Sequence, residues 1–302
     1  MSVLRVHHRP TVRRPLLLAA FGGWGDAGSA ATGAVGYLVG DPPPDPCATL
    51  DPEACFDFTV ERPVTRRGED GRWRLDYPEI AFHVLERPEA DHDLVLLHGP
   101  EPHNNWRTLA RAIADYVAEL EVETALTLGA FIGAVSHRKT PLVRRTPSST
   151  MNQRLADLGM EDTPYTGPTA FVTAVLHALD DRAVPVSSVW AASPPYLGAP
   201  NPAVSLTLLE GVERIAETSL DLGRLQGLAT DFLRKVESAL RENPEVAERV
   251  GQMVDLEDQE QEQESEPPPE GPPDLPVAGD VVEELERLFR ESRGNADPPQ
   301  GG

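Results

Sequence analysis

Residues 16–39, with the sequence LLLAAFGGWGDAGSAATGAVGYLV, constrain the fold more than any other part of the chain. A run of apolar residues ends at three closely spaced glycines, Gly23, Gly25 and Gly28, and continues into small residues that are compatible with a helix. This order predicts a buried strand, a tight turn and a helix that packs closely on its sheet.

The three glycines also match the GxGxxG spacing of dinucleotide-binding turns. Asp26 lies inside this motif, where its carboxylate would face the phosphates of a bound nucleotide. The acid that should contact the ribose about 20 residues further on falls instead in a proline-rich linker. Asp26 is better explained as a hydrogen-bond acceptor at the helix N-terminus, where negative charge is favourable. We therefore expect a structural turn at the mouth of a cleft and no cofactor.

The charge and hydropathy of the chain exclude several classes of partner. The net charge is −22, and residues 251–302 carry fifteen acids against three arginines. Such a surface repels phosphate backbones, which excludes nucleic acid. The apolar runs are shorter than the roughly 18 residues of a membrane span, and the one near the N-terminus is too short for a signal peptide. We expect a cytoplasmic protein with no membrane partner.

Strand-like and helix-like segments alternate through the first 200 residues, which predicts an α/β fold with a mostly parallel sheet flanked by helices. The predicted strands are 15–21, 55–60, 72–76, 80–85, 93–99, 124–131 and 186–192, and the predicted helices are 26–39, 106–120 and one with Gly167 as N-cap and Pro168 as first residue. Beyond residue 201 the pattern is helical.

This pattern divides the chain into six parts. They are an N-terminal arm (1–14), an α/β core (15–200), a helical extension (201–256), a disordered acidic and proline-rich linker (257–279), a short docking helix (280–292) and a disordered tail (293–302). The docking helix is amphipathic, so we expect it to pack on the main body or on another chain.

The segment HGPEPHNNW (98–106) follows a buried strand and precedes a helix, so it lies at the carboxyl edge of the sheet, where ligands of open α/β sheets bind. Glu101 could act as a general base or ligand contact, and His103 as a proton shuttle. Alternatively, the prolines stiffen the loop while Asn104 or Asn105 caps the helix.

His137 follows another strand in the same way, but the chain has no GxSxG motif for a nucleophile. The histidines show no metal-ligand spacing, so we predict no metal. Cys47 and Cys55 are interpreted as two ordinary small side chains. Tyr165, Gly167 and Tyr196 lie in loops, where aromatic residues either line a pocket or interface or serve loop packing.

Five segments resemble, in order and spacing, the proteasome assembly chaperone 2 family, in particular its actinobacterial members. They are GWGDAGSAATGAV, GPEPHNNW, TLGAFIGAVSHRKTP, YTGPTAFVTAVLHAL and SVWAASPPYLGAPNPAVSLTLLE, within about residues 15–256. The segment VVEELERLFRE is similar to the short helix that closes such bacterial members. The resemblance implies a phosphorylase/hydrolase-like α/β fold with a helical C-terminal extension, a non-catalytic protein-binding role and self-association.

Our preferred hypothesis is a non-catalytic, assembly-chaperone-like protein that forms homo-oligomers and binds a protein partner, with proteasome subunits as the clients that the resemblance suggests. The alternative is an enzyme of phosphorylase/hydrolase-like fold that acts on a nucleoside-like or small phosphorylated substrate. The first hypothesis predicts a sheet edge filled by Trp24 and Trp106, and the second a pocket with Glu101, His137 and an arginine. The candidate binding residues are Gly23, Trp24, Asp26, Glu101, Trp106, His137, Tyr165, Gly167 and Tyr196.

Overall fold

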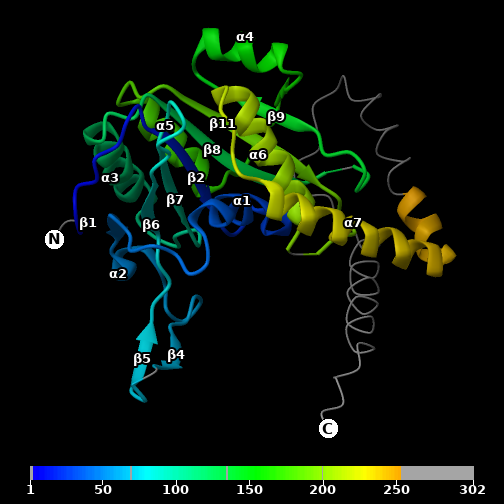
Figure 1. The fold of residues 1–302 in the computed structure, drawn as a ribbon, viewed down its shortest axis with the longest axis horizontal. Helices are drawn as coiled ribbons and strands as arrows, with labels where there is room; N and C mark the ends of the chain where they lie inside the picture. Colours follow the sequence, from blue (N-terminus) through cyan, green and yellow to red (C-terminus); the bar gives the residue numbers. More distant parts are fainter. Residues whose placement is uncertain (1–2, 69, 134, 199, 253–302) are drawn as a thin grey trace.

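The computed structural model describes residues 3–68, 70–133, 135–198 and 200–252. Within them, nine strands form one mixed sheet and two more form a separate hairpin (Figure 1). The predicted linker (257–279), docking helix (280–292) and tail (293–302) lie outside the described residues.

The strands are β1 (Leu4–Val6), β2 (Leu16–Phe21), β3 (Ala48–Leu50), β4 (Val64–Arg67), β5 (Trp73–Asp76), β6 (Ala81–Leu85), β7 (Leu94–Gly99), β8 (Thr124–Ile132), β9 (Leu142–Arg145), β10 (Glu161–Asp162) and β11 (Val186–Ser193). The helices are α1 (Ala30–Val39), α2 (Pro52–Cys55), α3 (Trp106–Glu119), α4 (Ser149–Asp157), α5 (Phe171–Asp180), α6 (Pro202–Ala216) and α7 (Gly223–Glu242), and residues 244–252 are also helical. A single 3-10 turn, Ala27–Ser29, precedes α1.

The sheet has the order β1-β3-β6-β7-β2-β8-β11-β9-β10. Its central strands β7, β2, β8 and β11 are parallel, whereas β6, β3, β1 and β9 pair antiparallel with their inner neighbours. The predicted α/β class with a mostly parallel sheet is therefore confirmed for the sheet centre. Since β7 and β8 flank β2 on opposite sides, the strand order changes direction at β2, which is where ligands of such sheets bind.

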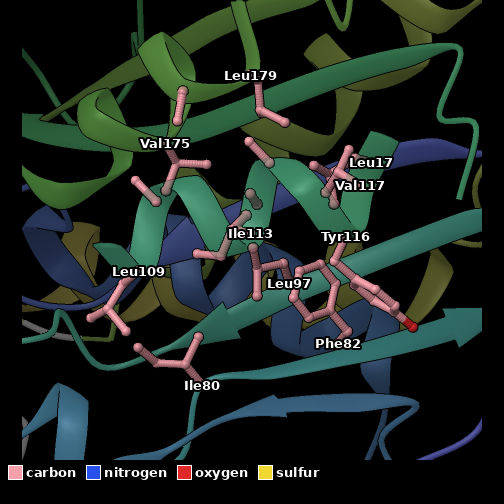
Figure 2. Packing of buried hydrophobic residues seen from close by; sticks show 14 of the residues in the cluster. Leu17, Ile80, Phe82, Leu97, Leu109, Ile113, Tyr116, Val117, Val175 and Leu179 are labelled. Atoms are coloured by element: carbon pink, nitrogen blue, oxygen red, sulfur yellow. The ribbon is translucent and has the colours of Figure 1, made fainter. Parts of the chain in front are cut away.

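Helices cover both faces of the sheet. On one face, α3 and α5 bury their apolar stripes against alternate residues of β2, β6 and β7, as Figure 2 shows for Leu109, Ile113 and Leu97. On the other face, α1 and α6 pack on the remaining residues of the same strands. The fully buried Ala30, Ala31 and Ala34 explain how α1 can lie so close to its sheet.

Some predicted elements differ from the structure. The strand predicted at 55–60 is wrong, because Asp51 caps a short helix that begins at Pro52, and the neighbouring strand is Ala48–Leu50. The helix predicted from Gly167 begins instead at Phe171. The N-terminal arm contributes the edge strand β1. The segments β4, β9, α4 and β10 were not predicted.

The helical extension is attached to the body in two ways. Helix α6 belongs to the same apolar cluster as α1 and the sheet. Helix α7 forms a smaller cluster in which Val236 and Ala239 pack with Tyr196, Val246 and Val250. No helix among the described residues is long and apolar enough to cross a membrane.

Candidate functional site

A cavity of 680 Å³ opens at the carboxyl ends of β2 and β7, at the point where the strand order reverses. It brings together four residues predicted from the sequence, Gly23, Asp26, Glu101 and Trp106. The other residues that line it are Gly22, Ser29, Thr32, Glu61, His98, Gly99, Pro100, Pro102 and His103. The lining that the structure describes thus carries three carboxylates and neither lysine nor arginine.

Asp26 caps helix α1, as the sequence predicts. Its Oδ1 accepts the backbone N–H groups of Ala31 (2.7 Å) and Thr32 (3.2 Å), and its Oδ2 accepts the Thr32 hydroxyl. Burial raises the pKa of this carboxyl group, while the hydrogen bonds from Thr32 and Ala31 oppose the shift. The carboxylate therefore stabilises the turn that the glycines form.

The Glu101 side chain, in the loop after β7, contacts both the turn after β2 and the N-terminus of α5. Its Oε1 accepts the backbone N–H of Phe171, at the first turn of α5, at 2.7 Å. A Cβ added to Gly23 would lie 2.9 Å from the Oε2 of Glu101, and the φ of Gly23 is +93°. Only glycine is suited to this position, so the turn after β2 is shaped around Glu101. This cross-loop cap also explains why α5 begins at Phe171 and not after Gly167.

Three further side chains of the cavity are those of His103, Trp106 and His98. The Nδ1 of His103, the predicted proton shuttle, accepts the backbone N–H of Asp57 at 3.0 Å. Trp106 donates its indole N–H to the Pro102 carbonyl at 2.5 Å. Burial lowers the pKa of His98 to about 4, with a smaller contribution from the charge of His83. His98 is therefore neutral at pH 7.

An exposed aromatic pair includes Trp24, which directly follows Gly23 of the cavity lining, although neither of its two rings is part of that lining. Trp24 is 60% exposed and Tyr165 is 48% exposed, and their ring centroids lie 6.4 Å apart. The Tyr165 hydroxyl donates to the Pro168 carbonyl at 2.8 Å, and Gly167 leaves room for the ring, since a Cβ there would lie 2.7 Å from the hydroxyl. The prediction that Trp24 fills the sheet edge is wrong, because its side chain faces outward. We call Trp24 and Tyr165 the aromatic rim.

His137 and Tyr196 do not line the cavity and form a separate cluster with helix α7. The Tyr196 hydroxyl accepts the His137 backbone N–H at 2.8 Å and bonds to His137 Nδ1 at 2.8 Å, while Nε2 lies 3.0 Å from Glu237 Oε1. Arg138 donates two hydrogen bonds to Glu237 and, with His137, lowers the pKa of that carboxyl group to about 2. These contacts fix α7 to the loop after β8. We call His137, Arg138, Tyr196 and Glu237 the α7 clamp. The predicted pocket of Glu101, His137 and an arginine is therefore not formed.

The cavity and clamp residues that sequence reasoning missed include His98, Glu61 and Glu237. His98 could have been found from the sequence as a polar residue near the end of β7, on the same face of the strand as Leu94 and Leu96, which pack with α1. Glu237 gave no local signal, because its partner His137 lies 100 residues earlier in the chain.

The described residues hold no group of three or more histidines, cysteines, aspartates or glutamates arranged to bind a metal ion. Cys47 and Cys55 are buried free thiols. Burial raises the pKa of both, for Cys55 to about 12, so neither is a thiolate at neutral pH.

The PAC2 family model matches residues 20–240 of the chain. A PAC2 family protein from Streptomyces avermitilis is 33% identical, with a TM-score of 0.69 over 74% of this chain and 95% of that one. A proteasome-assembly chaperone homologue from Mycobacterium tuberculosis is 32% identical, with a TM-score of 0.68 over 78% and 99% of the two chains. An archaeal proteasome activator from Pyrococcus furiosus, 16% identical with a TM-score of 0.62 over 78% and 100%, shares the fold. A search of curated proteins gives no significant match.

Proposed function

Because the chain belongs to the PAC2 family, we propose that it is a non-catalytic, cytoplasmic binding protein that assists the assembly of a protein client. The client that we propose is a proteasome subunit, since one relative at 32% identity is a proteasome-assembly chaperone homologue. We further propose that the protein works as a homo-oligomer.

The observation that carries this proposal is the aromatic rim. Trp24 and Tyr165 expose large side chains beside a concave, acid-lined cavity, at the edge of the sheet where such folds bind their ligands. Aromatic side chains of this kind dominate the binding energy of protein interfaces. The rim would contact the client, and Glu61 and Glu101 favour a client surface that carries lysine or arginine next to an apolar patch.

The enzyme alternative finds less support. Asp26 and Glu101 accept backbone hydrogen bonds that hold the ends of α1 and α5, so a proton transfer at either group would weaken the fold. His137 lies in the α7 clamp and not beside Glu101. The described lining of the cavity also offers a phosphate neither lysine nor arginine, and its three carboxylates repel it.

The proposal is tested by measuring the affinity of the purified full chain for purified α- and β-subunits of the proteasome of its own cell. We expect binding, and we expect Trp24→Ala and Tyr165→Ala each to weaken it by at least about tenfold, the effect of removing an interface anchor.

Trp73→Ala is the matched control, because Trp73 is also an exposed tryptophan (70%) but lies on the β4–β5 hairpin. Equal affinities of Trp24→Ala and the unaltered chain would overturn the proposed site. The absence of binding to any subunit would overturn the proposed client.

A further inference from the structure

Among the described strands, β4 and β5 pair with each other alone, and their hairpin projects from the body, away from the nine-stranded sheet (Figure 1). Ten large apolar side chains are exposed among the described residues, and five of them lie on or beside this hairpin. They are Val60 (67%), Val64 (51%), Trp73 (70%), Leu75 (56%) and Tyr77 (46%). Such a concentration of exposed apolar surface in one short segment marks an interaction site.

Three of these apolar side chains form a stripe along one face of the hairpin. Trp73, Leu75 and Tyr77 are spaced by two residues, so they point to the same side of the strand. Their neighbours on β4 are Thr65, opposite Leu75, and Arg67, opposite Trp73. Tyr77 continues the stripe to the body through its ring contact with Phe58 at 5.2 Å. We call Trp73, Leu75 and Tyr77 the hairpin stripe.

The hairpin is also rich in arginine, although the chain as a whole has a net charge of −22. Residues 61–77 carry five arginines against four acids, and among the described residues two of these arginines pair with a carboxylate, Arg66 with Asp76 (2.7 Å) and Arg74 with Asp70 (3.0 Å). The other three are Arg62, Arg67 and Arg72. The occupant of the stripe should therefore combine apolar side chains with negative charge.

The same chain contains a segment with this chemistry. Residues 257–279 carry eight acids and no basic residue, and residues 280–292 follow with the predicted amphipathic helix. The apolar side of that helix is Val281, Val282, Leu285, Leu288 and Phe289, and its polar side is rich in glutamate.

We propose that the hairpin stripe is the docking site for residues 280–292 of the same chain, with the acidic residues 257–279 lying against the arginines. Apolar contacts bury Trp73 and Leu75 under the helix, and charge pairing selects this surface over the acidic remainder of the body. The docked tail covers an apolar surface that would otherwise invite association with other proteins.

The length of the connection allows this arrangement. The 27 residues from 253 to 279 span up to about 90 Å when extended and about 30 Å on average as a flexible chain. A body of about 250 residues has a radius of gyration of about 18 Å. The tail therefore reaches every part of the surface, and its attachment gives it a high effective concentration at the hairpin.

Hydrogen exchange of the full chain, read by mass spectrometry over peptides from 281–289, tests the proposal. We expect these amides to be protected, and we expect the double variant Trp73→Ser with Leu75→Ser to speed their exchange at least about tenfold, the change for loss of about 1.4 kcal/mol of docking energy. High salt should also speed exchange, since it screens the arginine contacts. Trp24→Ser is the matched control and should leave the exchange unchanged.

Four results would overturn the proposal. The first is an unprotected tail in the unaltered chain. The second is protection that the double variant leaves intact, and the third is an equal loss with Trp24→Ser. The fourth is protection that disappears on dilution, which would assign the stripe to the tail of a second copy. A variant that fails to fold is recognised by faster exchange in β2, and single Leu75→Ser then replaces it.

Discussion

Removing the hydroxyl group of Tyr196 should destabilise the whole protein, because that group satisfies two buried atoms of His137. The hydroxyl accepts the His137 backbone N–H and bonds to its Nδ1, each at 2.8 Å, and the Tyr196 side chain is fully buried. Tyr196→Phe leaves both atoms without a partner. An unsatisfied buried polar group costs about 1–3 kcal/mol, so we expect a loss of about 3 kcal/mol in the free energy of unfolding.

Urea denaturation followed by circular dichroism measures this loss directly, and thermal denaturation should show a decrease in Tm of about 6–12 °C. Tyr37→Phe is the matched control, because the Tyr37 hydroxyl donates to the Asp221 carbonyl at 2.7 Å in an exposed position. That variant should lose less than about 1 kcal/mol. If Tyr196→Phe costs no more than Tyr37→Phe, the clamp between α7 and the β8 loop does not stabilise the protein, and a role of His137 and Tyr196 in binding becomes the better explanation.

Three further predictions concern the sheet and its carboxyl edge. The pKa of His98 is about 4 in the fold against an ordinary 6.5, so the unfolded chain takes up the proton first as pH falls. Stability should fall between pH 6.5 and 4 by at most about 3 kcal/mol, and His98→Asn should flatten this part of the curve of unfolding free energy against pH. Gly129→Ala should cost about 1–3 kcal/mol in urea denaturation, since the new Cβ would lie 2.5 Å from the Trp190 ring, whereas Gly227→Ala, in open space on α7, should be neutral or stabilising. Asp26→Ala should lower the unfolding free energy by about 1–2 kcal/mol through loss of the α1 cap, and Asp26→Asn should recover most of it.

The sequence predicts the elements whose apolar residues face the core. Strands β2, β7, β8 and β11 are close to their predicted bounds because burial on both faces gives them continuous apolar runs, and helix α3 is close to its own because burial of one face gives it a helical period. The hairpin strand β4 has four exposed residues and therefore no such period. The strand predicted at 55–60 is not formed, because Asp51 caps a short helix that ends at Cys55 and the residues that follow, 56–60, are loop and turn.

For the site, sequence reasoning succeeds where neighbouring strands end together. Gly23 and Glu101 follow β2 and β7, which are parallel neighbours, so their loops meet at one edge of the sheet. His137 follows β8 at the same edge, but its side chain is taken up by Tyr196 and by Glu237 of α7. The position of α7 depends on tertiary packing over 100 residues of chain, which no local pattern records.

The central claim, that the aromatic rim contacts a protein client, is tested most directly by photo-crosslinking from position 24. A benzoylphenylalanine placed at Trp24 in the full chain should crosslink to a proteasome subunit in the native cell, because the Trp24 side chain is 60% exposed beside the cavity. The same group placed at Trp73, which is 70% exposed on the hairpin, should give no crosslink to that subunit. Crosslinks to the subunit from position 73 but not from position 24 would contradict the account, as would the absence of any subunit crosslink from position 24.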